Sequence, residues 1–86
     1  MFQGKNVLVT GSARNTGTGI AKVFAAYGAT VFIHGRSPEQ VEKVVETLRA
    51  DGNRYLPIAF DVASEDDVAK AFASIQQQVG GLDVLV

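Results

Sequence analysis

Glycines and small polar residues that could bind phosphate gather between two apolar stretches near the start of the chain. They occupy residues 10–17, which follow the apolar run 6–9 and precede the helix-like stretch 18–27. Glycine lets a backbone approach a phosphate closely, and the free N–H groups at the start of a helix point toward negative charge. A strand, a glycine-bearing turn and a helix in this order predict a site for a nucleotide pyrophosphate.

The surroundings of this segment make the prediction more specific than a glycine pattern alone. A second apolar run, Thr30–His34, follows the helix-like stretch, so residues 6–34 have the order of a β-α-β unit. No Gly-Lys-Ser or Gly-Lys-Thr follows the turn, which disfavours a loop for phosphoryl transfer. The sequence thus favours nucleotide binding over a purely structural turn.

The glycine-bearing segment resembles the cofactor loop of the short-chain dehydrogenases/reductases, Thr-Gly-x-x-x-Gly-x-Gly. Gly11 and Gly17 fall on the first and third family glycines, and Asn15 stands at the middle one. Asn tolerates a positive φ better than other side chains do, so we expect the turn to keep its shape. We expect Gly19, one turn into the helix, to allow close contact between helix and strand. The resemblance covers the whole chain but only the first part of such an enzyme.

Apolar runs and helix boundary signals alternate to the end of the chain. Near-continuous apolar runs, typical of parallel strands covered on both faces, predict strands at Asn6–Thr10, Thr30–His34, Tyr55–Phe60 and Leu82–Val86. The first helix is expected to stop at Gly28. Ser37 and Ser64 are predicted N-caps of the next two helices, which end near Gly52 and Gly80.

This alternation predicts an α/β fold, a partial Rossmann-like doubly wound parallel sheet in the order β-α-β-α-β-α-β. The expected strand order is 3-2-1-4, which places residues 11–17 beside the switch point where ligands bind. We interpret residues 1–86 as the N-terminal part of a dinucleotide-binding domain with no internal boundary.

Two arginines near the end of the second strand bear on the choice of cofactor. Many dinucleotide folds place an acidic residue there to hold the ribose hydroxyls, whereas this chain has His34-Gly35-Arg36-Ser37. Arg36 and Arg14 would match a 2′-phosphate with paired hydrogen bonds, and Ser37 would add a donor. We therefore predict NADP(H) rather than NAD(H). The alternative is that both arginines are solvated surface charges and Ser37 is only a cap.

The end of the third strand completes the predicted site. The family resemblance implies that Asp61 and Val62 contact the adenine, while the alternative is that Asp61 organises the turn before Ser64. The predicted cofactor contacts are then Gly11, Ser12, Arg14, Asn15, Thr16, Gly17, Arg36, Ser37, Asp61 and Val62.

Catalytic and metal-binding residues are not predicted within this chain. His34, the single histidine, has no partner in the sequence that would orient it, so we expect a structural role. The resembled family uses Tyr-x-x-x-Lys for proton transfer, and neither Tyr27 nor Tyr55 is followed by lysine at that spacing. The acidic residues 65–67 lie in one helical turn, where compensation of the helix dipole explains them better than a metal site does.

The amino-acid composition disfavours some classes of partner and bears on the expected cellular location. Of the 86 residues 47% are hydrophobic and 20% charged, and the net charge of −1 includes no basic run, so nucleic acid is disfavoured. The lack of cysteine excludes disulfides and thiolate metal sites. The apolar runs are too short for a membrane span or a secretory signal, and we expect the protein in the cytoplasm.

The resemblance implies an oxidoreductase that transfers hydride between NADP(H) and a small carbonyl or alcohol substrate, and that assembles as a homo-tetramer. Because the family's catalytic residues have no counterpart here, we expect this segment to be a truncated part of the enzyme and inactive alone. One alternative is a non-enzymatic NADP(H)-binding sensor or regulatory module. Another is a different nucleotide-using α/β domain, although a flavin or methyltransferase site would be expected to place a carboxylate near Gly35.

Overall fold

A four-stranded parallel sheet lies at the centre of the structure, a computed structural model that describes residues 1–86 apart from the side chain of Asn15. The strand order is β3-β2-β1-β4. In chain order the elements are β1 (Asn6–Val9), α1 (Asn15–Ala26), β2 (Thr30–Gly35), α2 (Pro38–Leu48), a 3-10 turn (Arg49–Asp51), β3 (Arg54–Ala59), α3 (Glu65–Val79) and β4 (Val84–Leu85). The predicted Rossmann-like α/β fold and its strand order are confirmed.

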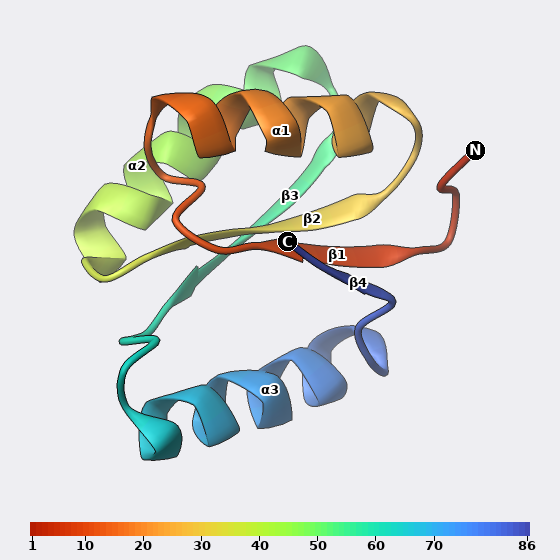
Figure 1. Ribbon diagram of the computed structural model, residues 1–86. Helices are drawn as coiled ribbons and strands as arrows, with labels where there is room; N and C mark the ends of the chain where they lie inside the picture. Colours follow the sequence, from red (N-terminus) through yellow and green to blue (C-terminus); the bar gives the residue numbers. More distant parts are fainter.

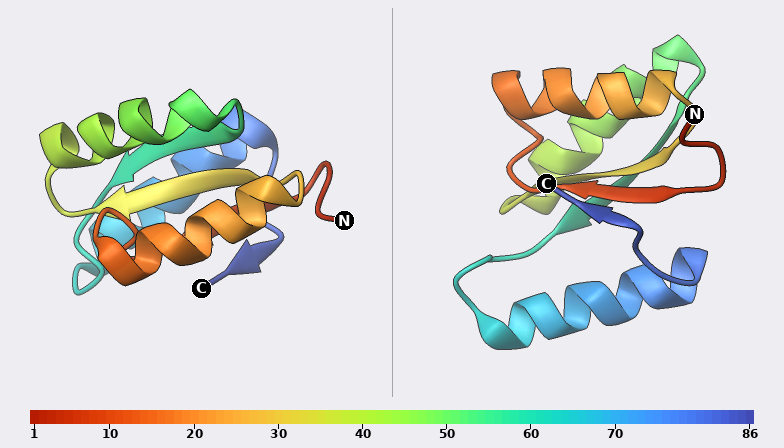
Figure 2. Two further views of the ribbon diagram at one scale, coloured as in Figure 1. Left: turned by 90° about the horizontal axis from the view of Figure 1, so that it is seen from above. Right: turned by 45° about the vertical axis from the view of Figure 1, so that its right-hand side comes forward.

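The helices form one layer on each side of the sheet. Helices α1 and α2 lie side by side over one face, and α3 lies against the other face (Figures 1 and 2). The chain leaves β1 toward β2 and β3 on one side and returns to β4 on the other. The topological switch point is therefore at the carboxyl end of β1, where the loop to α1 begins.

Side chains of the strands alternate between two apolar cores, although the sequence runs are continuously apolar. Val7, Val9 and Ile33 pack under α1 and α2, whereas Leu8 and Phe32 pack against α3. Both sets are buried because helices cover both faces of the sheet. This two-sided burial explains why the strands were recognisable as short apolar runs rather than as alternating patterns.

The predicted caps of the second and third helices are confirmed. The Ser37 Oγ accepts a hydrogen bond from the Gln40 N–H at 3.4 Å, and the Ser64 Oγ accepts one from the Asp67 N–H at 3.2 Å. Gly80 ends α3 with a left-handed φ of 84°. These local signals define where the two helices begin and where the third one stops.

Helix α1 begins three residues earlier than the sequence pattern predicts, at position 15 instead of 18. Residues 15–17 are polar or small, so they add nothing to the apolar stripe from which the helix was inferred. Position 15 is helical and needs no positive φ, which instead belongs to Gly11 at 66°. The tolerance of Asn for a positive φ is therefore not used at position 15.

The strand bounds also shift slightly. β1 ends one residue early, at Val9, and β2 extends to Gly35. β4 pairs only through Val84–Leu85, although the Val86 N–H still donates to the Leu8 carbonyl at 2.9 Å. Within the described residues there is no helix with both the length and the apolar character needed to cross a bilayer.

Tyr55 holds the corner between α2 and β3, at the edge of the sheet opposite the loop after β1. Its side chain is 1% exposed, and its hydroxyl donates to Asp51 Oδ2 at 2.8 Å. Burial and the neighbouring Asp51 carboxylate raise the pKa of Tyr55 to about 12. Tyr55 thus has a structural role.

We predict that the free energy of unfolding carries a contribution from neutral Tyr55 that is fully present below pH about 10 and lost as pH rises toward about 12. In that interval the unfolded chain releases the phenol proton while the folded chain retains it, so ionisation favours unfolding. Urea unfolding between these pH values should show a smaller alkaline loss in Tyr55→Phe than in wild type. Tyr27→Phe, at a tyrosine that is 51% exposed, is the control. Equal losses in wild type and Tyr55→Phe would contradict the assignment.

Candidate functional site

A cleft of about 660 Å³ opens at the carboxyl edge of the sheet, where the loops after β1, β2 and β3 meet. Its lining residues are Thr10, Gly11, Ala13, Arg14, His34, Gly35, Arg36, Ser37, Gln40 and Val62. Three segments far apart in the sequence therefore contribute to one site. This is the position at which open α/β sheets bind ligands.

The first turn of α1 packs directly on the loop after β1. A Cβ atom at Gly17 would lie 2.7 Å from the Gly11 carbonyl oxygen and 2.7 Å from the Ser12 Cα, closer than real Cβ contacts. Gly19, expected to allow this close contact, was the wrong glycine because a Cβ there would meet nothing within 4 Å. Gly17 thus allows α1 to start at the cleft.

Helix α1 begins beside the cleft, since its N-cap residue Arg14 is one of the lining residues. The N–H groups of a helix's first turn have no acceptor within the helix. Among the described side chains, the N-cap residue Arg14 makes no capping hydrogen bond, in contrast to Ser37 and Ser64 on α2 and α3. These N–H groups and the positive end of the helix dipole can therefore hold an anion.

Ser12 faces the protein interior and not the cleft. Its side chain is fully buried, and its Oγ accepts a hydrogen bond from the His34 N–H at 2.8 Å. Its carbonyl accepts a hydrogen bond from the Thr18 hydroxyl at 2.6 Å. Ser12 therefore stabilises the loop, and neither its side chain nor its backbone is exposed to the cleft in this structure.

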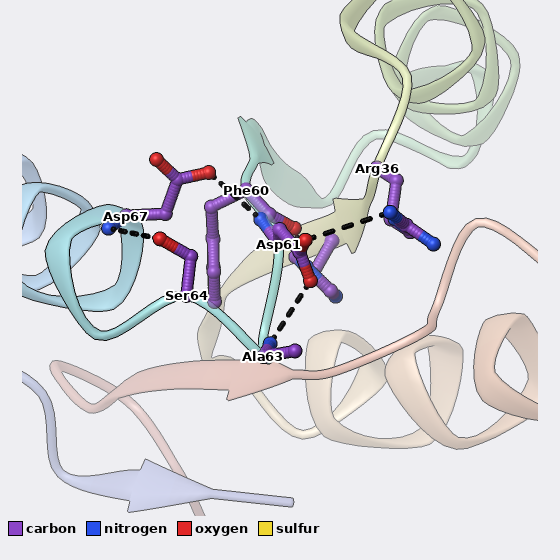
Figure 3. A network of polar contacts seen from close by, with 7 residues as sticks. Arg36, Phe60, Asp61, Ala63, Ser64 and Asp67 are labelled. Carbon is purple, nitrogen blue, oxygen red and sulfur yellow. Dashed lines mark hydrogen bonds and ion pairs between the residues drawn. The ribbon is translucent and has the colours of Figure 1, made fainter.

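Arg36 and Asp61 form an ion pair at the rim of the cleft, with Arg36 Nη2 and Asp61 Oδ2 separated by 3.5 Å (Figure 3). The two side chains are 78% and 38% exposed, so the pair is screened by solvent and contributes little stability. The other carboxylate oxygen of Asp61 accepts a hydrogen bond from the Ala63 N–H at 2.9 Å. Asp61 thus organises the turn before α3, as one of the two interpretations expected.

The structure brings half of the predicted cofactor contacts into the cleft lining: Gly11, Arg14, Arg36, Ser37 and Val62. Thr16 is exposed on α1, Gly17 packs beneath the loop, and Asp61 borders the cleft beside Arg36. The side chain of Asn15 lies outside the described part of the chain. Contact of these ten residues with a cofactor stays a prediction.

Sequence reasoning missed five lining residues: Thr10, Ala13, His34, Gly35 and Gln40. Gly35 carried a usable signal, because a glycine directly after a strand often marks close packing. A Cβ on Gly35 would lie 2.8 Å from Val41 Cγ2 on α2. The position of His34 in the cleft wall depends on how β1, β2 and β3 pair, which no local pattern encodes.

Comparison with known families identifies the fold more closely. A family model described as short chain dehydrogenase matches residues 5–86. The chain belongs to the short-chain dehydrogenase family. The resemblance noted in the sequence is therefore confirmed over nearly the whole chain.

Several relatives match along almost all of this chain. The glucose 1-dehydrogenase of Gluconobacter oxydans (strain 621H) is 42% identical, with 99% of this chain and 32% of the relative covered. The 3-oxoacyl-acyl-carrier-protein reductase of Aquifex aeolicus (strain VF5) is 40% identical, with 99% and 35% covered. The crystal structure of a metagenomic short-chain oxidoreductase in complex with NADP matches with a TM-score of 0.89 and 28% identity, over 98% of this chain and 38% of that one. The chain thus spans about a third of the length of the curated relatives it matches.

We predict that Gly17→Ala and Gly19→Ala change stability in opposite directions, although both replace a glycine within α1. Alanine at position 19 meets open space, so its higher helix propensity should stabilise the protein by up to about 1 kcal/mol. Alanine at position 17 must displace the backbone of the loop after β1, so it should destabilise by about 1–3 kcal/mol. Urea unfolding of the two variants measures both effects. Stabilisation by both substitutions would refute the close contact at Gly17.

Proposed function

We propose that this chain is the NADP(H)-binding part of a short-chain oxidoreductase that transfers hydride between NADP(H) and a carbonyl or alcohol substrate. The observation that carries the proposal is that a single cleft joins the glycine-bearing loop before α1 to Arg14 and Arg36. The complex of a related oxidoreductase with NADP supports the choice of ligand. The pyrophosphate and the adenosine half of the dinucleotide can each be matched to a different wall of the cleft.

The pyrophosphate would lie at the start of α1. The N–H groups of Gly11 and Ala13 already donate to the ring and the carbonyl of His34, at 2.8 and 3.1 Å. The donors that remain for the phosphates are the N–H groups of the first turn of α1, residues 15–17, which have no acceptor within the helix. Thr16 and Gly17 would thus contribute through their backbone.

The adenosine half would extend across the ends of β2 and β3. Arg36 follows β2 at the place where an acidic residue would hold free ribose hydroxyls, so its guanidinium favours a ribose that carries a 2′-phosphate. Ser37 and the start of α2 add donors for the same phosphate. The weak ion pair with Asp61 can be exchanged for the phosphate at little cost. Val62 would form the wall against the adenine.

The bound cofactor would supply the hydride, and this chain would bind and orient it. The residues that transfer the proton are proposed to lie in chain beyond these 86 residues, since Tyr27 and Tyr55 lack the family's partner lysine. The hydroxyl of Tyr55 is moreover engaged by Asp51 at the opposite edge of the sheet. We therefore infer that the segment alone binds NADP(H) without turnover. The cytoplasmic location and the tetramer remain expectations from the sequence and the family.

We predict that the chain binds NADPH more tightly than NADH and that Arg36→Asp removes this preference. Loss of charge-assisted hydrogen bonds to the 2′-phosphate should weaken NADPH binding by about 10- to 100-fold and leave NADH nearly unchanged. Arg54→Asp makes the same charge change at an exposed residue at the start of β3, away from the cleft, and should change NADPH affinity by less than about twofold. Isothermal titration calorimetry measures the five affinities, of NADPH and NADH for wild type and Arg36→Asp and of NADPH for Arg54→Asp. Tighter NADH binding, or an Arg36→Asp variant that retains NADPH affinity, would disprove the assignment.

A further inference from the structure

His34 has both ring nitrogens engaged although it lies in the wall of the cleft. The residue is 4% exposed, and its Nδ1 accepts a hydrogen bond from the Gly11 N–H at 2.8 Å. Its Nε2 lies 2.9 Å from the Phe60 carbonyl oxygen, an acceptor. Because one ring nitrogen must accept and the other must donate, this network requires the neutral imidazole with its proton on Nε2.

The backbone of His34 makes two further hydrogen bonds to the loop after β1. The His34 N–H donates to Ser12 Oγ at 2.8 Å, and the His34 carbonyl accepts from the Ala13 N–H at 3.1 Å. Residue 34 therefore makes hydrogen bonds to three consecutive loop residues, Gly11, Ser12 and Ala13. Through its ring it also reaches Phe60, whose aromatic ring lies 4.2 Å from the imidazole, centre to centre.

We propose that His34 is a positioning residue for the cofactor, which holds the glycine-bearing loop after β1 at a set distance from the segment after β3. The proposal rests on the proposed function, because the loop and that segment form the two walls between which NADP(H) would lie. The Gly11 N–H is directed inward by His34, which leaves the donors of α1 to face the cleft. Phe60 directly precedes Asp61 and Val62, so the same imidazole orients the adenine wall.

Charged groups of both signs surround this network. Arg14 from the loop after β1 and Arg36 from the end of β2 line the same cleft as His34. Asp61 follows Phe60, and its N–H donates to Asp67 Oδ2 on α3 at 3.2 Å.

Two substitutions test the hydrogen bonds of the two ring nitrogens of His34 one at a time. The amide oxygen of His34→Asn can occupy the place of Nδ1 and accept from Gly11 without titrating, but this variant loses the bond to Phe60. The longer side chain of His34→Gln can place its NH₂ near Nε2 and donate to Phe60, but it offers a methylene where Gly11 needs an acceptor. The pair therefore tests whether the acceptor for Gly11, and not merely a polar residue, is required.

The experiment measures the NADPH affinity of wild type and both variants at a single pH. We expect His34→Gln to bind about tenfold more weakly than wild type, because the Gly11 N–H loses its acceptor. His34→Asn should bind with an affinity between the two, because it keeps the acceptor for Gly11 and loses only the donor to Phe60.

Amide hydrogen exchange at Gly11, followed by NMR without ligand, distinguishes failure of this proposal from failure of the proposed function. The Gly11 amide should be protected in wild type and His34→Asn and exchange faster in His34→Gln. If wild type binds no NADPH, the proposed function fails. Equal Gly11 protection and equal affinities in wild type and His34→Gln would overturn the role of His34. Should His34→Gln fail to fold, equal NADPH affinities of wild type and His34→Asn would overturn the role of His34 in holding the loop to the segment after β3.

Discussion

The backbone contact between the first turn of α1 and the loop after β1 is the constraint on which the cleft depends. Residues 10–14 join β1 to α1, and the helix can start at the sheet edge only because Gly17 lets two backbones approach. Burial of Val7, Leu8 and Val9 on both faces fixes the strand that leads into this turn. The anion binding that we propose at this site would thus be a consequence of packing, since α1 must begin where the central strand ends.

The proposed selection of NADP(H) would be a local property of this edge and not of the whole molecule. The net charge is −1, so long-range attraction of a phosphate contributes little. The positive groups at the cleft are Arg14, Arg36 and the starts of α1 and α2, and the nearby acid Asp61 is paired with Arg36. A phosphate of the proposed cofactor would replace the exposed Asp61 carboxylate beside Arg36 without any rearrangement of the core.

Features that depend on neighbouring residues in the sequence, such as helix caps and strands, were predicted correctly. Features that depend on contacts between distant parts of the chain were not. Ser37 and Ser64 were recognised as caps because capping acts within one turn, and the strands were recognised because two-sided burial leaves continuous apolar runs. Gly17 and Gly19 could not be told apart, since only the path of the loop decides which one meets backbone. His34 appeared isolated because its partners are distant in the sequence and are brought together only by the pairing of β1, β2 and β3.

Mapping of backbone amide chemical shifts during titration with NADP⁺ tests directly whether the cofactor lies at the carboxyl edge of the sheet, across the starts of α1 and α2. We expect saturable shift changes concentrated at Thr16, Gly17, Arg36, Ser37 and Val62. A second cleft lies between α1 and α2 and is lined in part by Lys43 and Thr47. Shifts centred on those two residues, or no saturable shifts at all, would contradict this placement of the cofactor.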